Sequence, residues 1–187
     1  MRGIITILLF ISAVSAQNLI TNGDFEQDIS VGWTKDTSGY YIYIDRATTY
    51  EPDPDYELRV EKQTGSGYAR VRQIVDIPSV NNVTFSVKAK IYAYDNNADT
   101  LTFAAAAVII GYRNSSGVLL GETRICQFTA PCPWQNTPTC HLIMVNDSLW
   151  HTHSFSLASE LQNLPGVNPA NVQKIEVAFY DTTAHTC

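Results

Sequence analysis

The most regular pattern in this chain is Val83-Thr84-Phe85-Ser86-Val87-Lys88-Ala89-Lys90-Ile91-Tyr92-Ala93-Tyr94. Every second side chain from Val83 to Ala93 is apolar, whereas the side chains between them, from Thr84 to Tyr94, carry polar groups. Successive side chains of a β-strand point to opposite faces. The alternation therefore predicts a strand with one buried face.

Outward from this stretch, alternation and enrichment in β-branched and aromatic residues predict more strands, at residues 40–44, 69–77, 101–112, 118–126, 150–157 and 174–180. The stretch 101–112 contains four alanines, which favour a helix by propensity. Its flanking β-branched residues and the turn at 114–117 favour a central strand covered on both faces. Only residues 158–164 are expected to form a short helical turn. The pattern predicts an all-β sandwich of two antiparallel sheets.

The first sixteen residues have the features of a secretory signal peptide. Arg2 supplies a positive start, residues 4–14 form an almost unbroken apolar run, and residues 14–16 are small enough for cleavage. A retained signal anchor is the alternative interpretation. We therefore expect residues 17–187 to form one β-sandwich module that is secreted to the outside of the cell.

Charge and cysteine content limit the possible partners and compartment. The formal net charge is -6, and no basic patch appears, so nucleic acid is not an expected partner. In an oxidising compartment, an even number of cysteines indicates disulfides of undetermined connectivity, here among Cys126, Cys132, Cys140 and Cys187. A zinc site is the alternative because His141 adjoins Cys140, although no C-x2-C pair is present.

The most specific motif is Asn18-Leu19-Ile20-Thr21-Asn22-Gly23-Asp24-Phe25-Glu26, followed by Gly32-Trp33. It resembles the opening of the CenC-type carbohydrate-binding modules, which have a galactose-binding-like jelly roll. Gln73, and Trp150 followed by Phe155, occur in the order found in that family. The resemblance implies a jelly-roll β-sandwich that binds a polysaccharide or another glycan.

One departure from the family concerns the last strand. Family members close with a further strand after the equivalent of Phe179-Tyr180, but residues 181–187 here are short and polar. We therefore expect a jelly roll that lacks its final strand and leaves an open edge next to residues 18–25. Such an edge could pair with the missing strand or with a partner chain. The alternative function is accordingly a structural or adhesive surface subunit that assembles through this edge.

The resemblance also implies a structural Ca²⁺ ion at the opening motif. Glu26 would supply side-chain oxygens and Asp24 its carbonyl, and the acidic loop at residues 51–55 would add more oxygens. Calcium prefers six to eight such ligands. The alternative is that Glu26 caps a turn and the loop is only solvated.

Carbohydrate sites combine flat aromatic rings with directed polar groups. The alternating strands predict shared faces for Tyr92 with Tyr94 and for Tyr41 with Tyr43; together with Lys90 and Gln73, these form the candidate binding face. The alternative is that these tyrosines only satisfy β-propensity. Of the tryptophans, Trp33 and Trp150 are expected in the core, and Trp134 on the surface.

Catalytic motifs are not apparent in the sequence. It contains neither G-x-S-x-G nor H-E-x-x-H. His151 and His153 lie on one strand face and could bind a metal, but an ordinary strand face is the favoured interpretation. We therefore expect a binding module that is not an enzyme.

Overall fold

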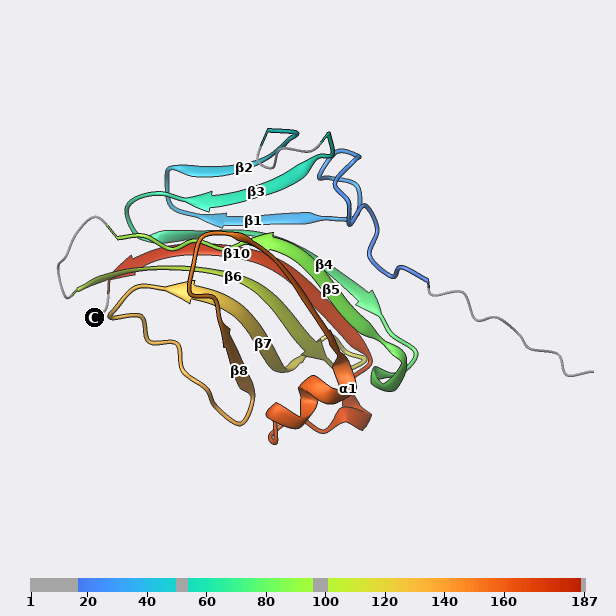
Figure 1. The fold of residues 1–187 in the computed structure, drawn as a ribbon. Helices are drawn as coiled ribbons and strands as arrows, with labels where there is room; N and C mark the ends of the chain where they lie inside the picture. Colours follow the sequence, from blue (N-terminus) through green and yellow to red (C-terminus); the bar gives the residue numbers. More distant parts are fainter. Residues whose placement is uncertain (1–16, 50–53, 96–100, 186–187) are drawn as a thin grey trace, which may run out of the picture.

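The computed structural model describes residues 17–49, 54–95 and 101–185. Within these ranges it contains ten strands in two layers (Figure 1). The larger layer is a six-stranded sheet with the strand order β1-β4-β10-β6-β7-β8. Its members are β1 (Thr34–Ser38), β4 (Gly67–Asp76), β6 (Thr102–Arg113), β7 (Leu119–Phe128), β8 (Cys140–Met144) and β10 (Lys174–His185).

The second layer consists of two separate antiparallel pairs, β2-β3 and β5-β9. Their members are β2 (Ile42–Ala47), β3 (Glu57–Lys62), β5 (Thr84–Lys90) and β9 (Trp150–Ser156). Short helical turns complete the fold: α1 (Leu157–Glu160) and the 3-10 turns Val80–Asn82, Leu161–Asn163 and Pro169–Asn171. The predicted all-β sandwich is confirmed, and the predicted helical turn at 158–164 is present.

The arrangement of sheets differs from the prediction in two respects. The second layer is divided in two, because β3 and β5 do not pair with each other. In addition, β7 and β8 run parallel, whereas the sequence predicted only antiparallel pairs. The parallel pair arises because residues 129–139 carry the chain back along β7 before β8 begins.

The main hydrophobic core lies between the two layers. Ile91 and Val177 are buried between the layers, and Phe85, Val87 and Phe179 pack against them. The side chains of β5 alternate between exposed and buried positions as the sequence predicted. The face of the six-stranded sheet toward this core is called the inner face below, and the opposite side is called the far face.

The alanine-rich segment forms strand β6, as predicted, rather than a helix. It pairs with β10 on one side and β7 on the other, so its backbone groups are used in two ladders. Val108 and Ile110 join the main core, while Ala107 and Ile109 belong to a second cluster on the far face. Burial on both faces explains why this strand carries no polar alternation.

Residues 181–185, which were expected to be too polar for a strand, continue the strand predicted at residues 174–180. Residues 174–185 form one strand, β10, which lies between β4 and β6 and pairs with both. Its polar end is compatible with a strand because Asp181 and Thr182 receive partners from β3 and β4: the Lys62 amide donates to Asp181, and Thr182 donates to the Gly67 carbonyl. Burial of polar side chains with hydrogen-bond partners was not visible in the residue pattern.

The opening motif is a compact turn structure that is bonded to β4. The side chain of Asn22, with a positive φ of 50°, donates to the carbonyls of Gln27, Asp28 and Val31. Trp33 is buried, as predicted, and its indole N–H donates to the Asn22 carbonyl over 2.9 Å. The motif therefore contributes to the core rather than to an exposed edge.

Candidate ligand-binding groove

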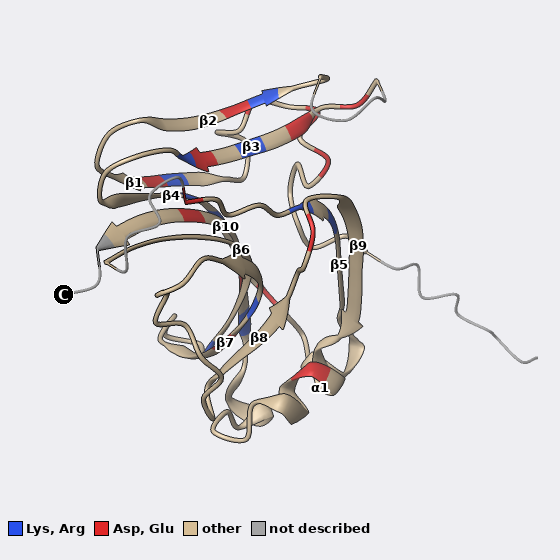
Figure 2. Ribbon diagram, turned by 60° about the vertical axis from the view of Figure 1, so that its left-hand side comes forward, with Lys and Arg blue, Asp and Glu red and all other residues tan. Residues whose placement is uncertain are grey.

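The divided second layer leaves a groove of about 1430 Å³ between β3 and β5. Figure 2 shows the β5-β9 pair standing apart from the β2-β3 pair over the six-stranded sheet. One wall is residues 55–64 with residues 23–26, and the other is residues 86–94 with Trp150. The floor comes from β6 and β10.

Small side chains on the floor leave the space between the two walls of the groove open. Ala104 and Ala106 of β6 line the floor beside Phe179 of β10. A single methyl group at each alanine fills little of the space between the two walls. The alanine-rich segment therefore both packs within the sheet as part of β6 and leaves room for the groove.

Tyr92 and Tyr94 form an exposed aromatic pair at the edge of the groove. Their rings lie nearly parallel, at 10° with centroids 6.1 Å apart, and the residues are 54% and 62% exposed. Between them, the Ala93 amide donates to the side chain of Gln127 on β7 over 2.8 Å. This bond fixes the backbone so that both rings project to the same side. The predicted shared face of the two tyrosines is confirmed.

Lys90 and Trp150 lie opposite each other in the β5-β9 ladder, and both line the same wall. Trp150 is half-exposed, so its predicted place in the core is wrong. The reason is the register of the ladder: Trp150 is paired with the exposed Lys90, so its ring lies on the face of the β5-β9 pair that points away from the core. Sequence reasoning assigned Lys90 to the site and missed Trp150.

The opposite wall carries Tyr56, whose ring is covered by the guanidinium of Arg46 at 4.2 Å. The same guanidinium donates through Nη1 to the carbonyls of Phe25, at 2.9 Å, and Glu26, at 3.1 Å. The Glu26 carboxylate accepts the Tyr56 amide at 2.9 Å. Arg46 thus joins the opening motif to this wall.

These contacts bear on the expected calcium ion. The backbone carbonyls around the motif are bonded to a guanidinium, and the side chains of Glu26 and Asp24 accept backbone amides, those of Tyr56 and Glu26 respectively. Among the described residues, no cluster of three or more His, Cys, Asp or Glu side chains is arranged to hold a metal. The described oxygens of the motif thus already have partners within the protein. Residues 51–53 of the acidic loop lie outside the described ranges.

Asp181 and Lys62 close the floor where β10 passes under β3. The Lys62 amide donates to Asp181 Oδ2 over 2.9 Å, and the Lys62 ammonium donates to the carbonyls of Thr64 and Gly65. Burial raises the pKa of Asp181 to about 7, and the nearby Glu61 carboxylate adds to the effect. Burial lowers the pKa of Lys62. Asp181 was not among the predicted site residues, because its isolation from water depends on tertiary packing.

The remaining predicted carbohydrate ligands lie away from the groove. Tyr43 points to the outer side of the β2-β3 pair, where Arg59 lies over its ring at 5.1 Å. Tyr41 precedes β2 with a φ of 55°, so the two tyrosines do not share a strand face. Gln73 is buried, and its amide exchanges two hydrogen bonds with the backbone of Thr21, at 2.8 and 2.9 Å. Gln73 therefore anchors the opening motif to β4.

The three described cysteines lie near the far face rather than at the groove. No disulfide joins Cys126, Cys132 and Cys140, and Cys187 lies outside the described residues. Cys140 of β8 lies opposite Glu122 of β7, whereas Cys126 of β7 lies opposite Met144. Cys126 and Cys140 are therefore displaced by four residues along the two strands, which corresponds to about 13 Å. That offset exceeds the reach of a disulfide between Cys126 and Cys140. Burial raises the pKa of Cys126 to about 12.

The expectations for His141 and Trp134 are decided by the groups that each ring contacts. The His141 ring, the proposed zinc ligand, instead bonds the buried Glu160 through Nδ1 at 2.5 Å. Trp134 is half-buried rather than freely exposed, because it packs on Phe128 and Tyr180 under the guanidinium of Arg124. His151 bonds Asp147 at 2.7 Å, and burial lowers the pKa of His153.

No protein-family model matches the chain. No curated protein matches it either. Among the described residues, no helix is long and apolar enough to cross a membrane.

Similar solved structures include the enzymatically active domain of tailspike protein 4 of bacteriophage CBA120, with 14% identity and a TM-score of 0.48. Another, with 12% identity and a TM-score of 0.44, comes from work on promiscuous carbohydrate-binding modules of the β-sandwich superfamily. A third is the family 11 carbohydrate-binding module of Clostridium thermocellum in complex with a β-1,3-1,4-mixed-linked tetrasaccharide, with 12% identity and a TM-score of 0.35.

The matches cover 90%, 92% and 87% of this chain, but 21%, 58% and 89% of the other chains. The chain thus spans about a fifth of the first structure and 58% of the second. Two of the three are β-sandwich carbohydrate-binding modules. Because every TM-score is below 0.5, these likenesses assign neither a family nor a function to this chain.

Proposed function

We propose that this chain is an extracellular, non-catalytic carbohydrate-binding module of the CenC type, which holds a polysaccharide in the groove between β3 and β5. The observation that carries the proposal is the exposed, parallel pair Tyr92 and Tyr94 at the groove edge. Sugar rings present flat C–H faces, and flat aromatic rings bind them with little loss of side-chain freedom.

The groove also offers the polar groups that a glycan needs. Lys90 and Trp150 stand on the tyrosine side, and Glu57 and Glu61 line the other wall. Hydroxyl groups along a sugar chain can bond such ammonium and carboxylate groups while the rings rest on the tyrosines.

The test is affinity electrophoresis of the purified protein in gels that contain single neutral polysaccharides, after a glycan array has identified a ligand. Replacing Tyr92 and Tyr94 together by Ala should cost about 1–3 kcal/mol of binding, because two aromatic contact surfaces are lost. The matched control is Tyr41→Ala with Tyr43→Ala, which removes two exposed tyrosines outside the groove and should leave binding unchanged.

Two results would contradict the proposal. One is undiminished binding by the Tyr92 and Tyr94 double variant, which would place the ligand elsewhere. The other is the release of new reducing ends when the protein is incubated with the bound polysaccharide, which would show catalysis. Thermal melts of both double variants establish that the fold is intact before binding is compared.

A further inference from the structure

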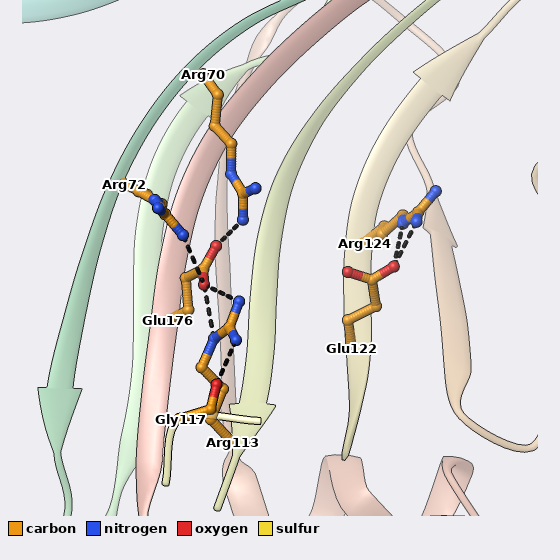
Figure 3. A network of polar contacts seen from close by, with 7 residues as sticks. All are labelled: Arg70, Arg72, Arg113, Gly117, Glu122, Arg124 and Glu176. Carbon is orange, nitrogen blue, oxygen red and sulfur yellow. Dashed lines mark hydrogen bonds and ion pairs between the residues drawn. The ribbon is translucent and has the colours of Figure 1, made fainter. Parts of the chain in front are cut away.

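The far face carries a cluster in which three arginines surround one carboxylate (Figure 3). Glu176 of β10 alternates with the core residues Ile175 and Val177, so its side chain points to the far face. There it forms ion pairs with Arg70 of β4 and Arg113 of β6, and Arg72 Nη1 lies 3.8 Å from its Oε2.

The cluster is held rigidly. The Glu176 side chain is only 2% exposed, although this face of the sheet is not covered by the second layer, because the guanidinium groups enclose it. Arg113 also donates through Nη1 to the Gly117 carbonyl over 2.6 Å. Gly111 faces Glu176 across the ladder, and a Cβ there would lie 3.3 Å from the Glu176 Cβ. The small residue leaves room for Arg113 to reach the carboxylate.

Positive charge exceeds negative charge in this cluster. Three guanidinium groups face one carboxylate, and the neighbouring Glu122 is paired with Arg124. Asp36, which accepts the Tyr68 hydroxyl at 3.0 Å, adds a further negative charge near Arg70, so the four arginines exceed the three carboxylates by one charge. Burial and the neighbouring arginines lower the pKa of both Arg70 and Arg113. A further anion near the arginines would relieve this repulsion.

Arg72 is the member best placed to receive such an anion. Its ion-pair contact with Glu176, at 3.8 Å, is longer than a hydrogen bond, and its side chain is 34% exposed. Arg70 and Arg113 are less exposed, at 24% and 15%, and directly bonded to Glu176. The planar guanidinium fork matches the two oxygens of a carboxylate or sulfate group.

We propose that Arg70, Arg72 and Arg113 form an oxyanion site that takes a carboxylate or sulfate group of an acidic polysaccharide, with Glu176 positioning the arginines. This rests on the proposed glycan-binding function but uses the opposite face of the six-stranded sheet. The whole chain has a net charge of -6, so a polyanion is not attracted to it in general. Binding of an acidic polysaccharide would therefore report a local site.

The experiment is affinity electrophoresis in gels that contain polygalacturonate, dextran sulfate or neutral dextran. We expect retardation by the carboxylated or the sulfated polymer, and the difference between these two identifies the preferred oxyanion. Arg72→Gln should weaken this binding about tenfold, the loss expected for one charge-assisted contact. Glu176→Gln, if its thermal melt shows a folded protein, should strengthen binding, because it removes the competing carboxylate.

Arg124→Gln is the matched control. It removes one arginine from the same face, but one that already has Glu122 as its partner. Equal losses in the Arg72 and Arg124 variants would indicate diffuse electrostatics and overturn the proposal, as would no retardation of the wild type by either acidic polymer. The Tyr92 and Tyr94 double variant should retain polyanion binding. Failure at the groove and failure at the far face are therefore separate results.

Discussion

The backbone amide of Lys62 donates a hydrogen bond to the carboxylate of Asp181 over 2.9 Å, which joins the β2-β3 pair to the central strand of the six-stranded sheet. The carboxylate gains this bond but loses contact with water. Desolvation prevails, since the pKa of Asp181 is raised from 3.8 to about 7. The link between the two layers is therefore sensitive to pH.

Asp181→Asn should change how stability depends on pH. A carboxyl group whose pKa is raised by folding stabilises the protein most below its unfolded pKa of 3.8, and this contribution is lost as the pH rises to about 7. Urea unfolding at several pH values should show that the variant gains stability relative to the wild type across this window. A difference that does not vary with pH would mean that Asp181 ionises as easily in the folded protein as in the unfolded chain.

His153 should act in the opposite direction. Burial and the adjacent His151 lower its pKa from 6.5. The neutral ring therefore stabilises the fold above the unfolded pKa of 6.5, and this contribution is lost as the pH falls below it. We expect His153→Gln to reduce the drop in melting temperature on acidification. Thr152→Val, which alters the adjacent exposed position on β9, serves as the control and should melt with the pH dependence of the wild type.

Arg46→Ala should destabilise the protein by about 2–3 kcal/mol, because two charge-assisted hydrogen bonds and the contact with the Tyr56 ring are lost. Arg46→Lys keeps the charge but not the planar group, and it should recover only part of the loss.

Calorimetric melts with added Ca²⁺ and with a chelator should coincide for the wild type. A melting temperature that Ca²⁺ raises would show that a metal, and not Arg46 alone, stabilises the opening motif.

Ala106→Leu should block the groove from below. Ala106 is half-buried in the floor, so a larger side chain would occupy space that the ligand needs. Polysaccharide binding should fall while the circular dichroism spectrum and the melt remain close to the wild type. Unimpaired binding by a folded variant would show that the ligand does not descend to the floor.

The sequence predicted the elements whose side chains alternate or are continuously apolar, which include β5 and β6. It missed β1, β3 and β8. Strand β1 is almost wholly polar and lies at a sheet edge, where charged residues are common and periodicity is weak. Strand β3 alternates charged and apolar residues too briefly to stand out, and β8 directly follows a loop rich in proline and threonine.

The candidate site could be predicted only in part, for a related reason. Tyr92, Tyr94 and Lys90 belong to the same alternating stretch, so their common side followed from local geometry. Trp150 joins them only through the β5-β9 register, and Asp181 through packing of β10 under β3. Contacts between distant strands depend on how the whole chain folds, and the alternation of residues within one strand does not reveal them.

The central place of β10 has a consequence for biosynthesis. Strands β4 and β6 are brought into one sheet by a segment, Lys174–His185, that is translated long after both of them. A nascent chain that has released β4 and β6 still exposes the edges that β10 will occupy. Pairings this distant in sequence form slowly, and uncovered strand edges favour aggregation. The ladders on the two sides of β10 can therefore form only after Lys174–His185 has left the ribosome.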